Sequence, residues 1–517
     1  MENISILWVD DEIDHLRPHI IFLEQKGFKL DTATNGMDAL EKLREKRYDL
    51  VFLDENMPGL SGLETLQELK NIQPLTPVIM ITKSEEESIM EDAIGSKIAD
   101  YLIKPVNPNQ ILLSIKKNLD TNRLVSEKTT SNYQQEFRKI SMELMNVRDY
   151  EAWVEMYKKL VFWELELEDL QDTGLREILL SQKDEANNLF CRFIEREYQD
   201  WFDPNLSGKP VLSQTAFRTF LPKNISAERP VFLFMIDNMR YDQWKVIEKE
   251  IQNDYRTVEE NMYFSILPTA TQYARNAFFS GLMPLEIEKK YPDKWVDEND
   301  EGSKNSFEDF FLGEQLKRLG KDYKFSYNKV IKLDFGRKLA RNIKDLMSNP
   351  LNIIVYNFVD MLSHAKTEME VIRELAEDDR AFRNLTLTWF KNSPLNEMLK
   401  NLKGTGAQII FTTDHGTVNV ANPLKVVGDR NTTSNLRYKH GKNLSYNPKE
   451  VFEVRNPKSI QLPSPNVSTA YIFAKENDFF AYPNNYNHYV TYYRNTFQHG
   501  GISLEEVIIP WALLKEK

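Results

Sequence analysis

Residues 49–62 read DLVFLDENMPGLSG, a short apolar run that ends in an acidic residue and is followed by a Gly- and Pro-containing turn. Three similar apolar runs surround it: ISILWV at residues 4–9, PVIMIT at 77–82 and DYLIKP at 100–105. Amphipathic stretches at residues 36–46 and 62–71 lie between these runs. This alternation predicts an N-terminal α/β domain, residues 1–122, with a doubly wound parallel sheet.

Each predicted strand of this domain ends in a polar side chain. The five residues are Asp10, Asp11, Asp54, Thr82 and Lys104. Because the carboxyl ends of strands line the ligand crevice of a doubly wound sheet, these side chains are expected to converge. Three carboxylates held together favour a hard cation such as Mg²⁺, and the Lys and Thr can hold phosphoryl oxygens. A single acidic residue at a strand end is as readily a helix cap, but the ordered set of five favours a phosphoacceptor site.

The stretches VDDE, LDENMPGLSG, MIT and YLIKP resemble the receiver domain of two-component response regulators. The resemblance implies that Asp54 accepts a phosphoryl group. It implies that Mg²⁺ is held by Asp11, Asp54 and the main-chain oxygen of Asn56. It also implies supporting roles for four other residues: Asp10 at the metal, Lys104 at the phosphoryl group, and Thr82 and Tyr101 as the switch pair.

One position departs from this resemblance. Lys83 follows the switch Thr, where receiver domains usually have a small residue. A long cation there is expected to alter dephosphorylation or partner access while leaving phosphoryl acceptance intact.

The middle of the chain has a different pattern. Residues 121–203 contain no glycine other than Gly174, and their apolar residues recur at helical spacing among dense charges. This predicts a central helical bundle at residues 123–205 with two to four long helices. The stretch DPNLSGKP at residues 203–210 marks its end. Beyond it, VFLFMID, NIIVYNFVD and IIFTTDHG predict a second, larger α/β domain at residues 206–517.

Three acidic residues close the clearest strands of this second domain: Asp237, Asp360 and Asp414. His364 follows Asp360 by four residues, so on a helix both side chains lie on one face and can hold one metal. His415 adjoins Asp414, and His499 stands in a loop just before an apolar run. Mixed imidazole and carboxylate ligands suit Zn²⁺ in catalytic sites. Taken alone, Asp414 with His415 is as readily a helix cap, and His499 is more simply a loop histidine.

Five stretches together resemble the PglZ branch of the alkaline phosphatase superfamily: FMIDNMRYD, PTATQYARNAFFSG, VDMLSH, TTDHG and HGGISLEEVIIP. The resemblance implies an α/β alkaline-phosphatase-like fold with two zinc ions and Thr271 as the nucleophile. It implies that the first zinc is held by Asp237, Asp414 and His415. It implies that the second zinc is held by Asp360, His364 and His499.

Substrate contacts are harder to assign from the sequence. Four residues are candidates for holding the phosphate oxygens: Asn276, Arg437, Lys439 and His440. The segment NLRYKHGKN at residues 435–443, which contains three of them, is as readily a solvated loop. A cationic segment would favour a phosphodiester, such as a small nucleotide or oligonucleotide.

Composition limits the function classes. Lys and Arg number 66 against 78 Asp and Glu, which gives a net charge of -12 and disfavours direct DNA binding. The single cysteine, Cys191, excludes an intramolecular disulfide and a zinc site built from several thiolates. The longest apolar runs, such as Val231 to Ile236, fall far short of the roughly 18 residues needed to insert into a membrane. A cytoplasmic protein is expected.

The three parts in this order resemble the PorX-type response regulators associated with type IX secretion. This resemblance implies a sensor histidine kinase as phosphodonor, links to a sigma factor or to secretion-machinery proteins, and a phosphorylation-dependent homodimer. The expected output is a zinc-dependent phosphodiesterase. Two alternatives stay open: a scaffold with a structural zinc site, and a transcription regulator that acts through a sigma factor.

Overall fold

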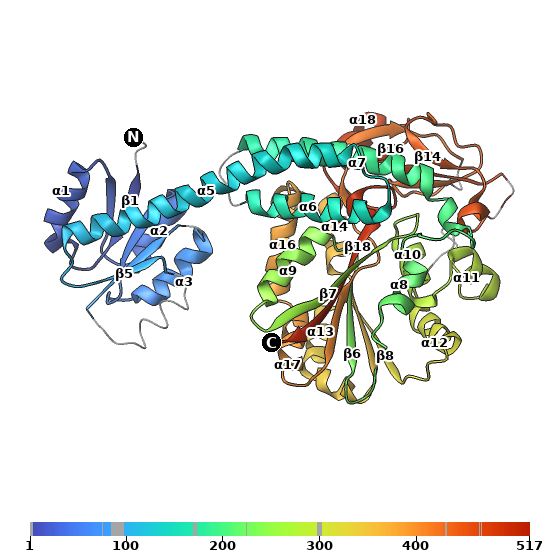
Figure 1. Ribbon diagram of the computed structural model, residues 1–517, viewed down its shortest axis with the longest axis horizontal. Coiled ribbons are helices and arrows are strands. Elements are labelled where there is room, and N and C mark those ends of the chain that lie inside the picture. The colour runs from blue at the N-terminus through green and yellow to red at the C-terminus, as the bar shows by residue number, and fades with distance from the viewer. Residues whose placement is uncertain are drawn as a thin grey trace. The chain divides into compact units, whose positions relative to one another are not determined.

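The computed structural model (Figure 1) describes residues 4–74, 76–83, 98–168, 173–223, 225–296, 302–429, 432–464, 466 and 468–517. For residues 116, 119–131 and 173 the description covers the backbone alone. The chain divides into two compact units, Met1–Gln135 and Glu136–Lys517. The division falls inside helix α5 (Pro108–Leu144). The expected domain boundaries near residues 122 and 205 stay a prediction.

The first unit is a five-stranded parallel sheet in the order β2-β1-β3-β4-β5. Its strands are β1 (Ser5–Val9), β2 (Lys29–Ala33), β3 (Leu50–Asp54), β4 (Val78–Thr82) and β5 (Asp100–Ile103). The connecting helices are α1 (Arg17–Gln25), α2 (Gly36–Glu45), α3 (Gly62–Ile72) and the start of α5, with a short 3₁₀ turn η1 (Ile13–Leu16) before α1. Two apolar clusters cover the two faces of the sheet. The predicted doubly wound α/β domain is confirmed, and burial of both faces explains why its central strands are apolar throughout.

The quoted turn places helix α3 directly against strand β3. Ser61 and Glu64 form a reciprocal cap at the start of α3. A Cβ atom on Gly62 would lie 2.3 Å from the main-chain oxygen of Asp54, so only glycine allows this approach. The Ser-Gly pair therefore fixes the helix beside the strand end that carries Asp54.

Helices α6 (Tyr150–Glu168) and α7 (Thr173–Glu197) follow α5 and pack as part of the second unit, which fits the predicted helical region. Arg383 of helix α16 (Asp379–Lys391) makes buried ion pairs with Glu164 at 2.9 Å and Glu168 at 2.6 Å on α6. It also pairs with Asp242 at 2.6 Å. These ion pairs connect helix α6 to helices of the α/β core.

The second unit is built on a six-stranded sheet in the order β7-β18-β10-β6-β9-β8. Its strands are β6 (Val231–Ile236), β7 (Tyr255–Phe264), β8 (Phe325–Val330), β9 (Leu351–Tyr356), β10 (Gln408–Thr412) and β18 (Ile508–Glu516). Strands β10, β6, β9 and β8 are parallel, whereas β18 is antiparallel to both β10 and β7. The α/β class predicted for this part is confirmed, and the antiparallel strand β18 between β7 and β10 was not part of the prediction.

Helices lie on both sides of this sheet (Figure 1). The group on one side contains α8 (Ser213–Phe220), α10 (Thr271–Ser280) and α12 (Glu308–Arg318). The opposite group contains α9 (Tyr241–Ile251), α13 (Leu333–Arg341), α16 and α17 (Pro394–Leu402). Further helices are α11 (Pro284–Lys290), α14 (Phe358–Glu368), α15 (Glu370–Leu375), α18 (Tyr486–Tyr493) and α19 (Leu504–Val507).

Three small sheets complete the second unit. They are β11 (Val418–Asn419) with β17 (Phe497–Gln498), β12 (Asn422–Lys425) with β16 (Asp478–Ala481), and the order β13-β15-β14. The last has bounds Tyr438–Gly441, Ala470–Ala474 and Val451–Val454. Within the described ranges, no helix combines the length and the apolar character that crossing a membrane requires.

We expect Arg383→Leu to lower the free energy of unfolding by about 3–5 kcal/mol, because it leaves buried carboxylates without their cation. Arg380→Leu is the matched control, since Arg380 lies on the same helix and pairs with Glu168 at 3.1 Å but is 46% exposed. It should cost at most about 1 kcal/mol. Urea unfolding of the full chain measures both, and equal shifts would contradict this account.

Candidate functional sites

The acidic site of the first unit lies where β1 and β3 end. Asp10 and Asp11 follow β1, Asp54 is the last residue of β3, and their carboxylate oxygens lie within 4.8 Å of one another. Lys104 Nζ lies 2.9 Å from a carboxylate oxygen of Asp10 and 2.9 Å from one of Asp54. One ammonium cannot neutralise three carboxylates, and an all-oxygen donor set of this kind fits Mg²⁺.

The charges at this site perturb one another. Burial raises the pKa of Asp54 to about 6, against the opposing effect of its hydrogen bond from Lys104. Burial acts to lower the pKa of Lys104, but hydrogen bonds to Asp54 and Asp10 outweigh it and raise that pKa. Lys104 is therefore charged, but it balances only part of the negative charge around Asp54. A bound cation would balance the rest.

The remaining receiver residues have distinct environments. Thr82 ends β4 and donates a hydrogen bond to the Glu55 carboxylate. Tyr101 lies on β5 with 39% of its surface exposed. Lys83 Nζ lies 3.4 Å from Glu12 at the surface. The switch roles of Thr82 and Tyr101, the metal contact of Asn56 and the effect of Lys83 stay predictions.

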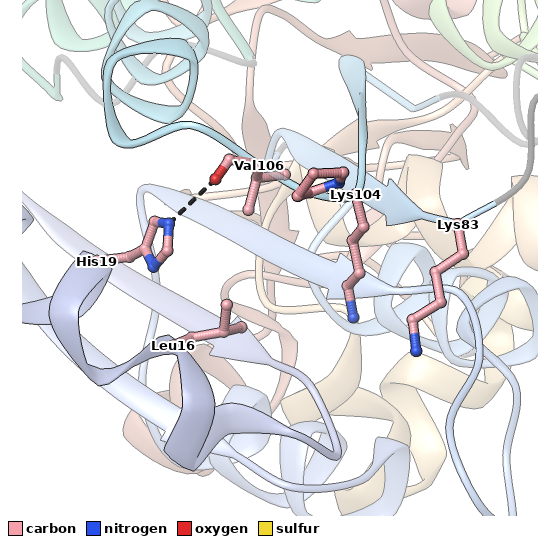
Figure 2. A pocket seen from close by; sticks show the side chains of 6 residues that line it. Leu16, His19, Lys83, Lys104 and Val106 are labelled. Carbon is pink, nitrogen blue, oxygen red and sulfur yellow. Dashed lines mark hydrogen bonds between the residues drawn. The ribbon is translucent and has the colours of Figure 1, made fainter.

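An open pocket of about 420 Å³ has Lys104 of the acidic site in its lining, and Figure 2 shows the side chains around this pocket. Its lining residues are Leu16, His19, Lys83, Lys104, Pro105 and Val106. His19 Nε2 lies 3.1 Å from the main-chain oxygen of Val106 and holds α1 to the segment that follows β5. Lys104 thus belongs both to the lining of the pocket and to the acidic site, where it contacts Asp54.

The first cluster of the second unit forms at the ends of two neighbouring parallel strands. Asp237 follows β6, and Asp414 and His415 come just after β10. Their ligand atoms lie within 4.8 Å of one another, and all three residues are buried. His415 Nδ1 lies 3.1 Å from the Gly416 carbonyl oxygen, which orients Nε2 toward the cluster.

The second cluster contains Asp360, His364 and His499, again with ligand atoms within 4.8 Å of one another. Asp360 was expected at a strand end, but β9 stops at Tyr356 and Asp360 lies in the first turn of α14. The helix does place Asp360 and His364 on one face, as their spacing predicted. His364 is 61% exposed at its side chain, so this cluster opens to solvent. The imidazole rings of His415 and His499 stack at 4.3 Å, which brings the two clusters together.

Both clusters fit divalent metal ions. Asp360 Oδ1 and Asp414 Oδ2 are buried and have no hydrogen-bond partner among the described residues. Burial raises the pKa of each of the carboxylates of Asp237, Asp360 and Asp414. Burial also lowers the pKa of His415 to about 4 and that of His499 to about 3, so both imidazoles are neutral near pH 7. Unpartnered carboxylate oxygens and neutral imidazoles are what metal binding requires.

Thr271 begins helix α10 at the edge of the first cluster. Its Oγ1 lies 3.1 Å from His415 Nε2 and 3.3 Å from Asp237 Oδ1. The structure thus places the predicted nucleophile against two of the predicted ligands of the first metal.

Arg275 is a site residue that the sequence analysis missed. It lies one helical turn after Thr271, and its guanidinium is 2.5 Å from Asp237 Oδ2 and 3.6 Å from Asp414 Oδ2. It also hydrogen bonds to Glu308, which is itself paired with Lys329. The spacing of four residues from Thr271 places both side chains on one helix face, and that signal could have identified Arg275.

The four candidate substrate residues are buried. Arg437, Lys439 and His440 belong to or adjoin strand β13, so their segment is not a solvated loop. Lys439 Nζ donates a hydrogen bond of 2.7 Å to the Thr433 carbonyl oxygen. Asn276, on α10, bonds to the Lys304 carbonyl oxygen at 3.1 Å. The guanidinium of Arg437 is bound within the protein interior, which leaves it unavailable to a substrate in this structure. Substrate contact by Asn276, Lys439 and His440 stays a prediction.

Family models match three consecutive parts of the chain. The response regulator receiver domain matches residues 6–116, and the PorX response regulator linker domain matches residues 123–202. The BREX system PglZ alkaline phosphatase-like domain matches residues 218–513, more than half of the chain. The chain belongs to the PglZ alkaline phosphatase-like family. With the receiver and linker it has the PorX-type architecture, as the sequence predicted.

Individual relatives match the receiver part. The chain is 37% identical over 129 residues to the transcriptional regulatory protein ZraR of Klebsiella oxytoca, covering 25% of this chain and 29% of that protein. It is 39% identical over 114 residues to a CpxR homolog of Haemophilus influenzae, covering 22% of this chain and 48% of that protein. The chain therefore spans less than half the length of these relatives.

Solved receiver structures are similar to the same part. A CheY-like receiver domain protein from Methanospirillum hungatei is 27% identical, covers 24% of this chain and 98% of its own, and has a TM-score of 0.23. A two-component response regulator from Clostridium difficile is 30% identical, covers 23% and 97%, and has a TM-score of 0.22.

We expect the second unit to bind two divalent metal ions and Asp360→Ala or His499→Ala to lose one of them. A site with three protein ligands loses most of its affinity when one ligand is removed. Metal content after gel filtration, measured by mass spectrometry, reports the number bound. His488→Ala, an exposed histidine on α18, is the control that should keep both ions. Unchanged metal content in both ligand variants would show that these ligand sets are wrong.

Proposed function

We propose that this chain is a cytoplasmic response regulator in which phosphorylation of Asp54 controls a zinc-dependent phosphodiesterase in the second unit. One observation carries the enzymatic part of the proposal. Thr271 Oγ1 lies within 3.3 Å of Asp237 and His415, in the cluster that adjoins the second one through the stacked His415 and His499 rings. A nucleophile beside paired metal-binding clusters has no role in a purely structural zinc site.

Zinc is the metal we assign to both clusters. Each donor set mixes carboxylate oxygens with imidazole nitrogens, which Zn²⁺ accepts in catalytic sites. Two bound zinc ions would supply the positive charge that stabilises the attacking and leaving oxygens of an in-line displacement. In the receiver, Mg²⁺ at Asp11, Asp54 and Asn56, supported by Asp10, would assist phosphoryl transfer.

The chain's own residues then define the reaction. Thr271 Oγ1 attacks phosphorus and forms an O–P bond, while the bond to the leaving alcohol breaks on the opposite side. The Thr271 hydroxyl gives up its proton to a solvent water during attack, and the leaving oxygen takes up a proton from water. Water subsequently attacks the threonyl-phosphate ester, which releases the product and restores the Thr271 hydroxyl. Arg275 keeps Asp237 in position throughout, because its guanidinium binds Asp237 and Glu308.

A phosphodiester is the substrate class that the charges support. Arg275 contacts the site, but its charge is already offset by Asp237 and Glu308. A diester phosphate has a single negative charge and therefore demands less cationic support than a monoester dianion. The net charge of -12 disfavours long nucleic acid, so a small nucleotide or oligonucleotide fits best.

The regulatory part of the proposal rests on the receiver site. We infer that a sensor histidine kinase phosphorylates Asp54, that Thr82 and Tyr101 switch in response, and that the receiver then dimerises. By its resemblance to PorX-type regulators, the chain would serve type IX secretion, with a sigma factor or secretion-machinery proteins as further partners. A scaffold or sigma-factor regulator with a structural zinc site remains the alternative, and it predicts no phosphoester turnover.

We expect Thr271→Ala to retain both zinc ions and to lose phosphodiesterase activity by on the order of 10³-fold or more, because it removes the nucleophile and leaves every ligand in place. Thr271→Ser is the matched control that keeps a hydroxyl and should keep measurable turnover. The assay compares a phosphomonoester, a phosphodiester with the same leaving group, and short linear and cyclic oligonucleotides. A clear monoester preference, or full activity in Thr271→Ala, would overturn the proposal.

We expect beryllofluoride with Mg²⁺ to shift the full chain from monomer toward dimer in sedimentation velocity, since it mimics the phosphorylated carboxylate. Asp54→Ala should abolish this shift. Asp14→Ala, which removes an exposed carboxylate of η1 after β1, should respond as the unmodified chain does. A response that persists in Asp54→Ala would show that another residue accepts the group.

A further inference from the structure

The loop that carries His499 is attached to a buried ion pair between Arg437 and Glu506. Both side chains are fully buried. Arg437 Nη2 lies 2.6 Å from Glu506 Oε2, and its Nε lies 3.2 Å from Glu506 Oε1. A charged pair in such a position is costly to desolvate unless its remaining hydrogen-bonding capacity is used. The other hydrogen bonds of Arg437 and Glu506 therefore indicate which segments the ion pair holds in place.

Glu506 binds the segment that follows His499. Its Oε1 accepts a hydrogen bond of 2.9 Å from the main-chain N–H of Gly501, and its Oε2 accepts one of 2.8 Å from Ser503 Oγ. Arg437 packs on the same segment, because a Cβ atom on Gly501 would lie 2.9 Å from its guanidinium. The ion pair thus fixes the main chain two residues after a predicted metal ligand.

Thr269 extends this attachment to the nucleophile. Its Oγ1 accepts a 3.0 Å hydrogen bond from the Gly500 N–H and donates one of 2.8 Å to the Gly501 carbonyl oxygen. Its main-chain oxygen lies 3.1 Å from His499 Nδ1, which orients Nε2 of that ring toward Asp360. Thr271 follows two residues later, so the segment that carries the nucleophile and the loop that carries the ligand are joined at this point.

Arg437 also hydrogen bonds to the main chain just before and at the start of β16. Its Nη2 donates to the Glu476 carbonyl oxygen at 2.9 Å, and its Nη1 donates to the Asp478 carbonyl oxygen at the start of β16. Helix α7 contacts the same loop from outside, since Asn187 Oδ1 accepts a 2.8 Å hydrogen bond from the Leu504 N–H. The loop is held from both the small sheets and the helical region.

We propose that Arg437 and Glu506 are positioning residues that hold His499 and the Thr271 segment in the geometry needed for metal binding and attack. The part of this proposal that concerns attack by Thr271 rests on the proposed function. It assigns Arg437 a role inside the protein in place of the substrate contact expected from its charge. Glu506 acts through the Gly501 N–H, and Arg437 acts by holding the Glu506 carboxylate.

A pair of double variants tests this role. Arg437→Met with Glu506→Gln, the amide variant, removes both charges but keeps an amide oxygen that can accept from Gly501. Arg437→Met with Glu506→Leu, the apolar variant, removes both charges and the acceptor as well. Since both variants lose the same Arg437 contacts, they differ only in the link to the His499 loop. Leu402→Ala, a buried residue on α17, is a control for general loss of stability.

Two measurements report on positioning without any turnover. Competition with a chromophoric chelator gives the zinc affinity of the full chain. Amide hydrogen exchange of the metal-free chain, followed on peptides that contain residues 499–503, gives the opening of the loop. We expect the apolar variant to bind the weaker zinc about 10–100-fold less tightly than the amide variant and to exchange faster in this segment. Leu402→Ala should match the unmodified chain in zinc affinity.

Thr269→Val tests the same connection without touching a buried charge, in case a double variant does not fold. It should weaken zinc binding by about 10-fold, since it removes the hydroxyl that joins the two segments. Equal zinc affinity and equal exchange in the two double variants would overturn the inference, as would an equal loss in Leu402→Ala. If the unmodified chain hydrolysed no phosphoester, the proposed function would fail while these two measurements still decided the positioning role.

Discussion

Repulsion among buried carboxylates is the constraint on which both functional sites depend. In each unit, acidic side chains gather near the ends of parallel strands or, for Asp360, in the first turn of α14, and the ligand atoms of each cluster lie within 4.8 Å of one another. Burial raises the pKa of Asp54 in one site and of Asp237, Asp360 and Asp414 in the other. Such clusters persist in a folded protein when cations share the space. The cations present in the chain, Lys104 and Arg275, supply part of this charge, and metal ions would supply the rest.

The surrounding fold serves to hold these charges at fixed positions. Gly62 lets α3 approach the strand end that carries Asp54, and Arg275 binds Asp237 from a helix face shared with Thr271. Helices α6 and α7 contact the α/β core of the second unit through Arg383 and Asn187. Asn187 places α7 in direct contact with the segment that follows His499.

Much of this arrangement could be predicted from the sequence because it follows from strand ends. Polar residues after apolar runs indicated the acidic site and the first cluster of the second unit. The second cluster was indicated by the spacing of Asp360 and His364, which lie on one face of α14 and not at a strand end. The sequence says less about contacts between residues that are far apart along the chain. Arg437 was a candidate for substrate contact, yet its partner Glu506 lies 69 residues away and becomes adjacent only in the folded chain. The partners of Arg275, Asp237 and Glu308, are likewise distant in sequence, and only its spacing from Thr271 could have indicated its place in the site.

Anomalous X-ray diffraction at the zinc edge, from crystals of the full chain, tests whether zinc balances the buried carboxylates of the second unit. Charge balance by zinc predicts two strong peaks in this unit, about 4 Å apart. One should lie among Asp237, Asp414 and His415, and the other among Asp360, His364 and His499. A single peak, or peaks outside these six residues in zinc-loaded protein, would contradict it, because the buried carboxylates would then be balanced by some other means.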